Sequence, residues 1–219
     1  MKVVYEDNHL IIVNKDPGEL SQSDYTKDQS LVEKVKNYLK IKYQKKGNVF
    51  LGLVNRLDRP TSGLLIFSKT SKALTRMNKL LKEKKIKKTY LAITENKPKN
   101  NKGELIDYLL KNQNKNKSFV VDKTHTKSKK AILSYKLLKS LKNYFLLEIA
   151  LETGRHHQIR CQLANIGCYI KGDIKYGAKR PNKNKSISLH SKKIEFIHPV
   201  SKLNILVEAK PPDESIWLN

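Results

Sequence analysis

The chain has only two cysteines among its 219 residues, Cys161 and Cys168. Two cysteines give no disulfide framework, so a reducing, cytoplasmic setting is the default expectation. No apolar run approaches the ~20 residues that a membrane-spanning helix needs. The first ten residues, MKVVYEDNHL, lack the long apolar region of a secretory signal. These absences disfavour a disulfide-stabilised secreted protein and a helical membrane protein.

Recognisable metal and nucleotide motifs are also missing. His156, His157 and Cys161 are close in sequence, but adjacent histidines on a helix point in different directions and no Cys-x-x-Cys occurs, so we expect no metal site. The spacing from Gly167 to Gly172 is that of a phosphate-binding loop, but an aspartate then stands where lysine is required. No G-x-G-x-x-G follows a predicted strand, which disfavours a dinucleotide or methyl-donor fold.

Acidic residues are scarce, with 20 against 45 basic ones and a formal net charge of +25. A charge of this size favours a phosphate-rich partner, although a surface simply coated with lysine is the alternative. Arginine is scarce too, with six against 39 lysines. Four of the six fall in two short stretches, Arg56 with Arg59 and Arg155 with Arg160. There the planar guanidinium is expected to hold a carboxylate, a phosphate or a base.

Apolar spacing predicts more strands than helices, and many strands come in adjacent pairs. Strands are expected at Lys2–Asp7, Leu10–Asn14, Val49–Leu53, Leu64–Phe67, Lys88–Thr94, Ala131–Leu138, Tyr144–Leu151, Ile187–His198 and Leu203–Glu208. Helices are expected from the cap Ser30 to Gln44, over Ala73–Lys84 after the cap Ser71, and over His156–Asn165. The pattern from Gly103 to about Lys123 is weak, with room for two short strands around Asn112–Lys117. We predict one domain over residues 1–219, of α+β class, with a mixed, mainly antiparallel sheet and packed helices.

The chain is organised around the stretch VNRLDRPTSGLLIFSKT, residues 54–70. It places Asp58 between Arg56 and Arg59, in a polar loop that leads into an apolar strand. A loop held between two buried strands is a rigid mount for a reactive side chain. Asp58 is therefore the candidate nucleophile.

A second polar constellation, ETGRHHQIR, opens the predicted late helix at residues 152–160. Gly154 permits an unusual backbone turn, and Arg155, Gln158 and a histidine in the first helical turn would suit an anion or a nucleotide. A surface helix with ordinary salt bridges is the alternative. If Arg160 meets Asp58, it would keep that carboxylate ionised and lower its pKa.

Several of these motifs together resemble the RluA-type pseudouridine synthases. NRLDRPTSGLL (residues 55–65) is similar to their H-R-L-D-x-x-T-S-G-L-L motif, and TGRHHQIR (residues 153–160) to their T-G-R-x-H-Q-I-R motif. KTYLA (residues 88–92) resembles their K-x-Y-x-A strand, and GDIKYG (residues 172–177) their G-D-x-x-Y-G loop. The likeness spans about residues 3–200, in the order in which these motifs occur in the family.

The resemblance implies an RNA pseudouridine synthase, an isomerase, with a bent sheet, a basic RNA cleft and neither metal nor organic cofactor. Asp58 matches the catalytic aspartate, Arg160 the arginine that pairs with it, and Arg56 the one that enters the RNA stack as the uridine leaves. Tyr90 matches the catalytic tyrosine, which packs on the target base and is a candidate for the base that removes a proton, although a plain strand tyrosine is the alternative for that residue. Further substrate-binding residues are expected at Arg59, Thr61, Arg155, His157 and Gln158.

The expected partner is structured RNA, either ribosomal or transfer RNA, with a preference for ribosomal RNA, and the expected state is a monomer. One residue departs from the family pattern, because Asn55 stands where histidine is usual. Since the chain starts directly in the catalytic strands, we expect the catalytic domain without a preceding S4-type domain. The alternative to an enzyme is an RNA-binding or ribosome-assembly factor that catalyses no reaction.

Overall fold

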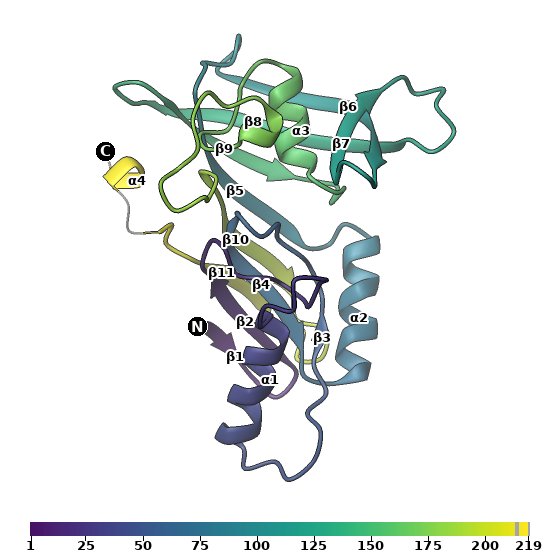
Figure 1. Ribbon diagram of the computed structural model, residues 1–219. Helices are drawn as coiled ribbons and strands as arrows, with labels where there is room; N and C mark the ends of the chain where they lie inside the picture. The colour runs from purple at the N-terminus through teal and green to yellow at the C-terminus, as the bar shows by residue number, and fades with distance from the viewer. Residues whose placement is uncertain (213–214, 219) are drawn as a thin grey trace. The chain divides into compact units, whose positions relative to one another are not determined.

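The computed structural model describes residues 1–212 and 215–218 (Figure 1). The chain folds into two compact units, one made of residues 1–86 and 191–218 and the other of residues 87–190. The chain passes from the first unit to the second after Ile86 and returns after His190, within one strand. The expectation of a single domain over residues 1–219 stays a prediction.

The first unit is built on a sheet of short strands. These are β1 (Lys2–Glu6), β2 (Leu10–Lys15), β3 (Gly52–Leu53), β4 (Ser62–Ser68), β10 (Leu189–Ile197) and β11 (Asn204–Glu208). β2 pairs antiparallel with both β1 and β4, β3 pairs antiparallel with β4, and β11 pairs antiparallel with β10. β2 and β4 are buried along nearly their whole length, so they form the centre of this unit.

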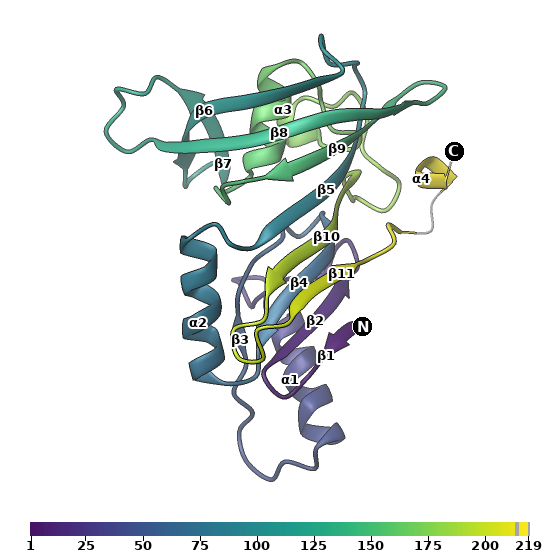
Figure 2. The same ribbon diagram turned by 180° about the vertical axis from the view of Figure 1, so that it is seen from behind.

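Helices cover this central sheet on both faces. Alternate residues of β2 and β4 pack with α2 (Ser71–Lys82) in a core that includes Leu10, Ile66 and Met77. The other helix, α1 (Leu31–Lys42), buries an apolar stripe and lies across the opposite face of the sheet in the two views (Figures 1 and 2). A short helix, α4 (Ser215–Leu218), closes the described chain.

The second unit is an antiparallel sheet with one helix packed on it. Its strands follow the spatial order β5 (Lys87–Thr94), β9 (Phe145–Leu151), β8 (Lys129–Ser140), β6 (Lys102–Asn112) and β7 (Lys117–Val121). The helix α3 (Gln158–Asn165) packs against β6 and β7, and a short 3-10 helix, η1 (Ile174–Tyr176), follows it. Cys161 on α3 is buried in this core beside Leu109 and Ala131, as expected of a small core residue.

The structure confirms the predicted α+β class, with a mostly antiparallel sheet and packed helices. Two local predictions are wrong. The cap of α2 is Thr70 and not Ser71, since the Thr70 side chain accepts from the Ala73 amide. The strand expected over Val49–Leu53 is reduced to Gly52–Leu53. No helix of the described residues is long and apolar enough to cross a membrane.

Candidate active site

A buried lysine anchors the loop that carries Asp58. Lys15, the last residue of β2, is fully buried, and its Nζ donates to the Arg59 carbonyl at 3.0 Å and the Thr61 carbonyl at 2.7 Å. A third bond, of 3.0 Å, goes to the carbonyl of Asp16. Because these bonds fix the backbone just after Asp58, they restrict where its carboxylate can point.

Burial lowers the pKa of Lys15 to about 8, against the opposing effects of nearby carboxylates that include Glu19 and Asp58. At neutral pH the side chain is therefore still mostly an ammonium. Its charge lies close enough to Asp58 to favour the ionised form of that carboxylate. Asp58 itself is half-buried, so it combines a fixed backbone with access to solvent.

The segment after Lys15 makes a second set of bonds to the same loop. Gly18 donates its amide to the Arg59 carbonyl at 2.8 Å, and the Arg59 Nε donates back to the Gly18 carbonyl at 3.0 Å. The Ser21 hydroxyl donates to the Leu57 carbonyl at 2.7 Å. These reciprocal bonds hold the loop on both sides of Asp58.

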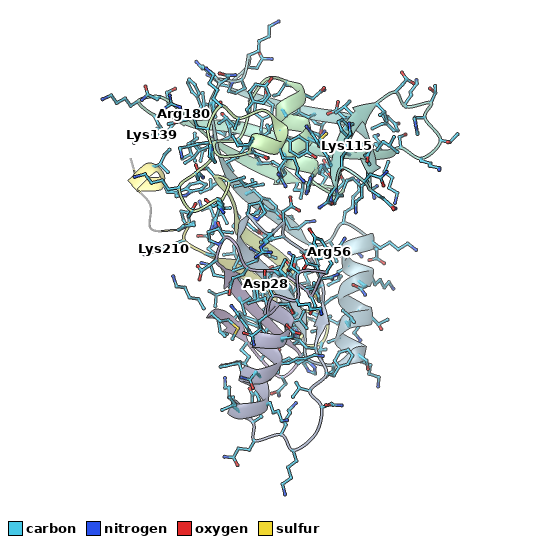
Figure 3. The ribbon with its side chains drawn as sticks, viewed as in Figure 1. Asp28, Arg56, Lys115, Lys139, Arg180 and Lys210 are labelled. Carbon is cyan, nitrogen blue, oxygen red and sulfur yellow. The ribbon has the colours of Figure 1, made fainter. Side chains whose placement is uncertain are left out.

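The two arginines beside Asp58 differ in their surroundings. Arg59 Nη2 forms an exposed ion pair of 2.7 Å with Asp28, whereas Arg56 is exposed to solvent. The bonds from Arg59 to Gly18 and Asp28 connect two loops of the first unit. Asp28 lies on one of these loops and Arg56 on the other, and both are labelled in Figure 3. Exposure suits the predicted insertion of Arg56 into RNA, while Arg59 is at least partly engaged within the protein.

Asn55, the departure from the family pattern, performs a structural task. Its side-chain Oδ1 accepts from the Ile66 amide at 2.8 Å, and its Nδ2 donates to the Leu64 carbonyl at 3.4 Å. The side-chain amide thus makes hydrogen bonds to the backbone of β4 like those that a neighbouring strand would make. An imidazole cannot match this pairing as closely, because its single donor and single acceptor diverge across a ring.

In the second unit, the predicted residue Arg160 is buried and held by a carboxylate. Its Nε and Nη2 donate to the two carboxylate oxygens of Asp173 at 2.7 and 2.8 Å, with side-chain exposures of 5% and 1%. The guanidinium also lies over the ring of Tyr176, 5.1 Å from its centre. A bidentate pair with a stacked ring fixes both the position and the plane of the guanidinium.

His157 belongs to the same buried cluster. Its Nδ1 lies 3.1 Å from the Tyr176 hydroxyl, and its ring stacks on that of His156 at 3.8 Å between centres. The Tyr176 hydroxyl also accepts from the Ser118 amide of β7 at 2.8 Å. Burial raises the pKa of Tyr176 well above its ordinary value, so the phenol stays protonated at physiological pH.

Gln158 and Arg155 form the turn that leads into α3. The Gln158 Oε1 accepts from the Thr153 hydroxyl at 2.7 Å and from the Arg155 amide at 3.0 Å, and its Nε2 donates to the Ile132 carbonyl at 3.1 Å. Arg155 is exposed, and its Nε donates to the Lys130 carbonyl at 2.9 Å. With its amide engaged inside the protein, Gln158 shapes the loop that presents Arg155.

The predicted residues thus fall into separate groups. Asp58, Arg56, Arg59 and Thr61 share one loop of the first unit, whereas Tyr90, Arg155, His157, Gln158 and Arg160 belong to the second unit. Tyr90 is buried on β5, and Thr61 is buried with a hydroxyl that has no hydrogen-bond partner among the described residues. The pairing of Asp58 with Arg160 stays a prediction.

Sequence reasoning missed the two residues that anchor these groups. Asp173 lies in the stretch that resembles the family's G-D-x-x-Y-G loop, and Lys15 directly follows the strand expected at Leu10–Asn14. A charged residue at the end of a mainly apolar strand is the available signal for Lys15, because β2 is buried along nearly its whole length. Their partners, at Thr61 and Arg160, are 46 and 13 residues away, and local patterns do not show such pairings.

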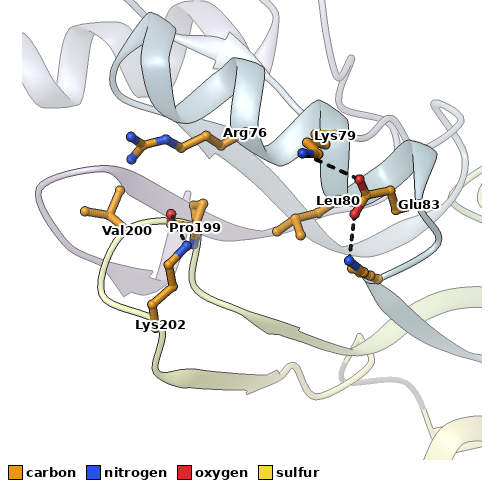
Figure 4. Close-up of a pocket in the computed structure, with 8 residues that line it drawn as sticks. Arg76, Lys79, Leu80, Glu83, Pro199, Val200 and Lys202 are labelled. Atoms are coloured by element: carbon orange, nitrogen blue, oxygen red, sulfur yellow. Dashed lines mark hydrogen bonds and ion pairs between the residues drawn. The ribbon is translucent and has the colours of Figure 1, made fainter.

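A surface groove of about 560 Å³ lies apart from the predicted site residues, in the first unit (Figure 4). It runs between the end of α2 and the β10–β11 turn, and its lining is mainly basic and aliphatic. The lining residues are Arg76, Lys79, Leu80, Glu83, Lys85, Pro199, Val200 and Lys202. Glu83 is paired with Lys85 at 2.8 Å, and no grouping of possible metal ligands is found among the described residues.

Comparison with known proteins identifies the kind of protein these groups belong to. The family model described as RNA pseudouridylate synthase matches residues 9–165. A protein of Rickettsia felis described as ribosomal large subunit pseudouridine synthase C is 36% identical over 212 residues, covering 96% of this chain and 67% of the relative. Its namesake from Buchnera aphidicola subsp. Baizongia pistaciae is 35% identical, covering 94% and 66%. An uncharacterized RNA pseudouridine synthase of Bacillus subtilis, YhcT, is 30% identical, covering 97% and 69%.

Solved structures agree on the fold. Human RNA pseudouridylate synthase domain containing 4 superimposes with a TM-score of 0.82 at 20% sequence identity, covering 99% of this chain and 90% of that one. Human RNA pseudouridylate synthase domain containing 1 gives a TM-score of 0.75 at 17% identity, covering 99% and 85%. At these identities the likeness shows the shared fold.

Proposed function

Because the chain belongs to the RNA pseudouridylate synthase family, and to its RluA type, we propose that it isomerises uridine in ribosomal RNA with Asp58 as the catalytic carboxylate. The observation that carries the proposal is the anchoring of the Asp58 loop by Lys15, which fixes a half-buried carboxylate beside an exposed arginine. Several curated relatives are described as acting on the large ribosomal subunit, and this supports ribosomal RNA over transfer RNA. The cytoplasm, where ribosomal RNA is modified in bacteria, is the compartment we propose.

The reaction needs no net exchange of atoms. The bond between N1 of uracil and C1′ of ribose breaks, the base rotates, and C5 joins C1′ while the proton on C5 is lost and N1 gains one. The uridine must first leave its stack, at a cost of a few kcal/mol. Arg56 is exposed and carries a flat cation that can fill the vacancy by stacking.

Asp58 acts as the carboxylate that attacks the sugar or draws off a proton, and in either role it must be ionised. The buried ammonium of Lys15, which lies in the first unit with Asp58, favours the ionised carboxylate. Arg160 is the second proposed partner of Asp58. A guanidinium has five N–H donors, and Asp173 accepts from two, which is compatible with contact to a second carboxylate.

Tyr90 is proposed to pack against the target base from β5, where it is already enclosed by the protein. A buried tyrosine ring offers a flat apolar surface with a polar tip, which suits an extruded pyrimidine. The same position would allow it to accept the proton that leaves C5 if its hydroxyl is ionised during the reaction.

Tritium release from ribosomal RNA labelled with 5-tritiated uridine tests the proposal. We expect release by the wild type, and a loss on the order of 10³-fold or more with Asp58→Asn, because removing a central catalytic group has effects of that size. Asp122→Asn, a change at an exposed carboxylate of the second unit, is the matched control and should release tritium normally.

Equal release by Asp58→Asn and the wild type would refute the catalytic role of Asp58. If neither protein released tritium from ribosomal RNA, while transfer RNA gave Asp58-dependent release, the substrate assignment alone would be wrong. Absence of release from both RNAs, with unimpaired RNA binding, would favour a binding protein without turnover.

A further inference from the structure

Lys88 is a half-buried lysine on β5 that the proposed mechanism does not use. It lies two residues before Tyr90, so the two side chains point to the same face of the strand, about 7 Å apart along it. The Lys88 ammonium lies beside Gly154, with its Nζ 3.6 Å from where a side-chain carbon would stand at that glycine. Lys88 therefore connects the face that carries Tyr90 with the loop that leads into α3.

The surroundings of this ammonium lack a compensating anion. Among residues 1–212 and 215–218, no hydrogen bond or ion pair ties Lys88 to another group. Burial lowers its pKa, and no carboxylate opposes that effect. A partly desolvated cation without a counter-charge is unfavourable, so an anionic ligand at this place would be stabilised by it.

The neighbouring loop leaves this ammonium open to a ligand. Gly154 is exposed and has no side chain to block the approach of a ligand. Arg155 follows it, also exposed, with its Nε tethered to the Lys130 carbonyl at 2.9 Å. This tether directs the Arg155 guanidinium toward β8, so the ammonium beside the open backbone of Gly154 is that of Lys88.

We propose that Lys88, beside the open backbone of Gly154, binds one backbone phosphate of the substrate RNA, next to the uridine held at Tyr90. This inference rests on the proposed function, since it takes the phosphate from the RNA that is modified. The separation along β5 is on the scale of one nucleotide, so the phosphate would belong to the target nucleotide or its neighbour. The subsite would position the extruded nucleotide, and Lys88 would act by binding and not in the chemical step.

RNA binding by Lys88→Met in the Asp58→Asn background tests the subsite without relying on turnover. Loss of one charged contact to phosphate should weaken the affinity for ribosomal RNA about tenfold and reduce the slope of log affinity against log salt by about 1. Lys99→Met, which removes an exposed lysine from a loop of the same unit, is the control and should change affinity far less. The melting temperature of Lys88→Met should stay the same or rise, whereas a structural role predicts that it falls.

A phosphate scan makes the assignment specific. RNA oligonucleotides carry a single neutral methylphosphonate at one position near the target uridine, and the position is varied. At one position the wild type should lose affinity, whereas the affinity of Lys88→Met should not fall any further. Additive losses at every position would overturn the subsite. A rise in melting temperature with inorganic phosphate that depends on Lys88, without any effect on RNA affinity, would overturn the RNA assignment in favour of a free phosphate site. If Asp58-dependent turnover fails but the scan shows the non-additive position, the proposed isomerase function is wrong and the phosphate contact stands.

Discussion

At the scale of single residues, Lys15 shows how a buried charge can serve a loop it does not belong to. Its ammonium donates to the Thr61 carbonyl inside the protein, and it is a second donor to the Arg59 carbonyl, which also accepts from the Gly18 amide. A buried lysine is expensive, and a neutral donor would hold the same carbonyls at lower cost. The charge is useful where it lies close to Asp58, whose ionised form it favours.

Lys15→Met is expected to destabilise the protein by about 1–3 kcal/mol at pH 7, because buried carbonyls lose their donor. The wild type should also gain stability with rising pH between about 8 and the ordinary lysine value of 10.5, since the unfolded chain binds more protons there. This gain is about 3 kcal/mol at most, and it should vanish in the variant. Denaturant unfolding at a series of pH values checks both effects.

The control for this series is Lys40→Met, which removes an exposed lysine of α1 and should keep the stability and the pH response of the wild type. A Lys15→Met protein as stable as the wild type, with the same rise above pH 8, would show that Lys15 does not anchor the loop.

The residues of the site differ in how far the sequence predicts them. Asp58 stands in a polar loop between two arginines, a residue type that is scarce in this chain. This local pattern marks Asp58 as a site residue from the sequence alone. The pair of Arg160 with Asp173 joins a helix to a loop, and the sequence predicted another partner for that arginine. Substrate binding by Gln158 stays a prediction; its side-chain amide contacts the Arg155 amide and the Ile132 carbonyl, and these contacts depend on how β8 and the turn before α3 meet, which the sequence does not show.

At the scale of elements, the fold of the first unit depends on a junction around Glu6 at the end of β1. Glu6 accepts from Lys42 at 2.8 Å and Tyr43 at 2.7 Å, both at the end of α1, and from Lys69 at 2.9 Å, just after β4. Burial raises the pKa of Glu6, but these bonds and one from Tyr38 outweigh it and lower the pKa to about 2. One carboxylate thus ties a helix end to two strands.

Since the pKa of Glu6 is depressed from 4.5 to about 2, its contribution to stability is present above pH 4.5 and is lost as the pH falls through that window. We expect the wild type to lose about 1–3 kcal/mol from this group on acidification, and Glu6→Gln to lose far less. Thermal unfolding between pH 5 and about 2.5 measures the difference. The change Glu104→Gln, at an exposed glutamate of β6, should leave the acid response unchanged; an identical response in Glu6→Gln would contradict the role of the junction.

Elements with strong local signals were predicted well. The Ser30 cap of α1 is confirmed as a full capping box with Glu33, which explains why that helix could be placed from the sequence. β6 was the weakest prediction. Its 11 residues end in a lysine- and asparagine-rich turn and are only partly buried, so neither alternation nor apolar content shows the strand.

At the scale of the whole molecule, the net charge of +25 should dominate the affinity for RNA. Binding that neutralises many phosphates releases counterions, so the affinity should fall about 10³-fold or more between 50 and 200 mM salt. Filter binding of ribosomal RNA across this range measures the slope. A slope near zero would mean that the lysines coat the surface without contacting RNA.

The most direct test of Asp58-dependent isomerisation maps pseudouridine in ribosomal RNA from cells that lack this gene and carry either the wild type or Asp58→Asn at equal levels. We expect a uridine of the large ribosomal subunit to become pseudouridine with the wild type and to stay uridine with the variant. An identical pseudouridine map in the two cell lines would contradict it.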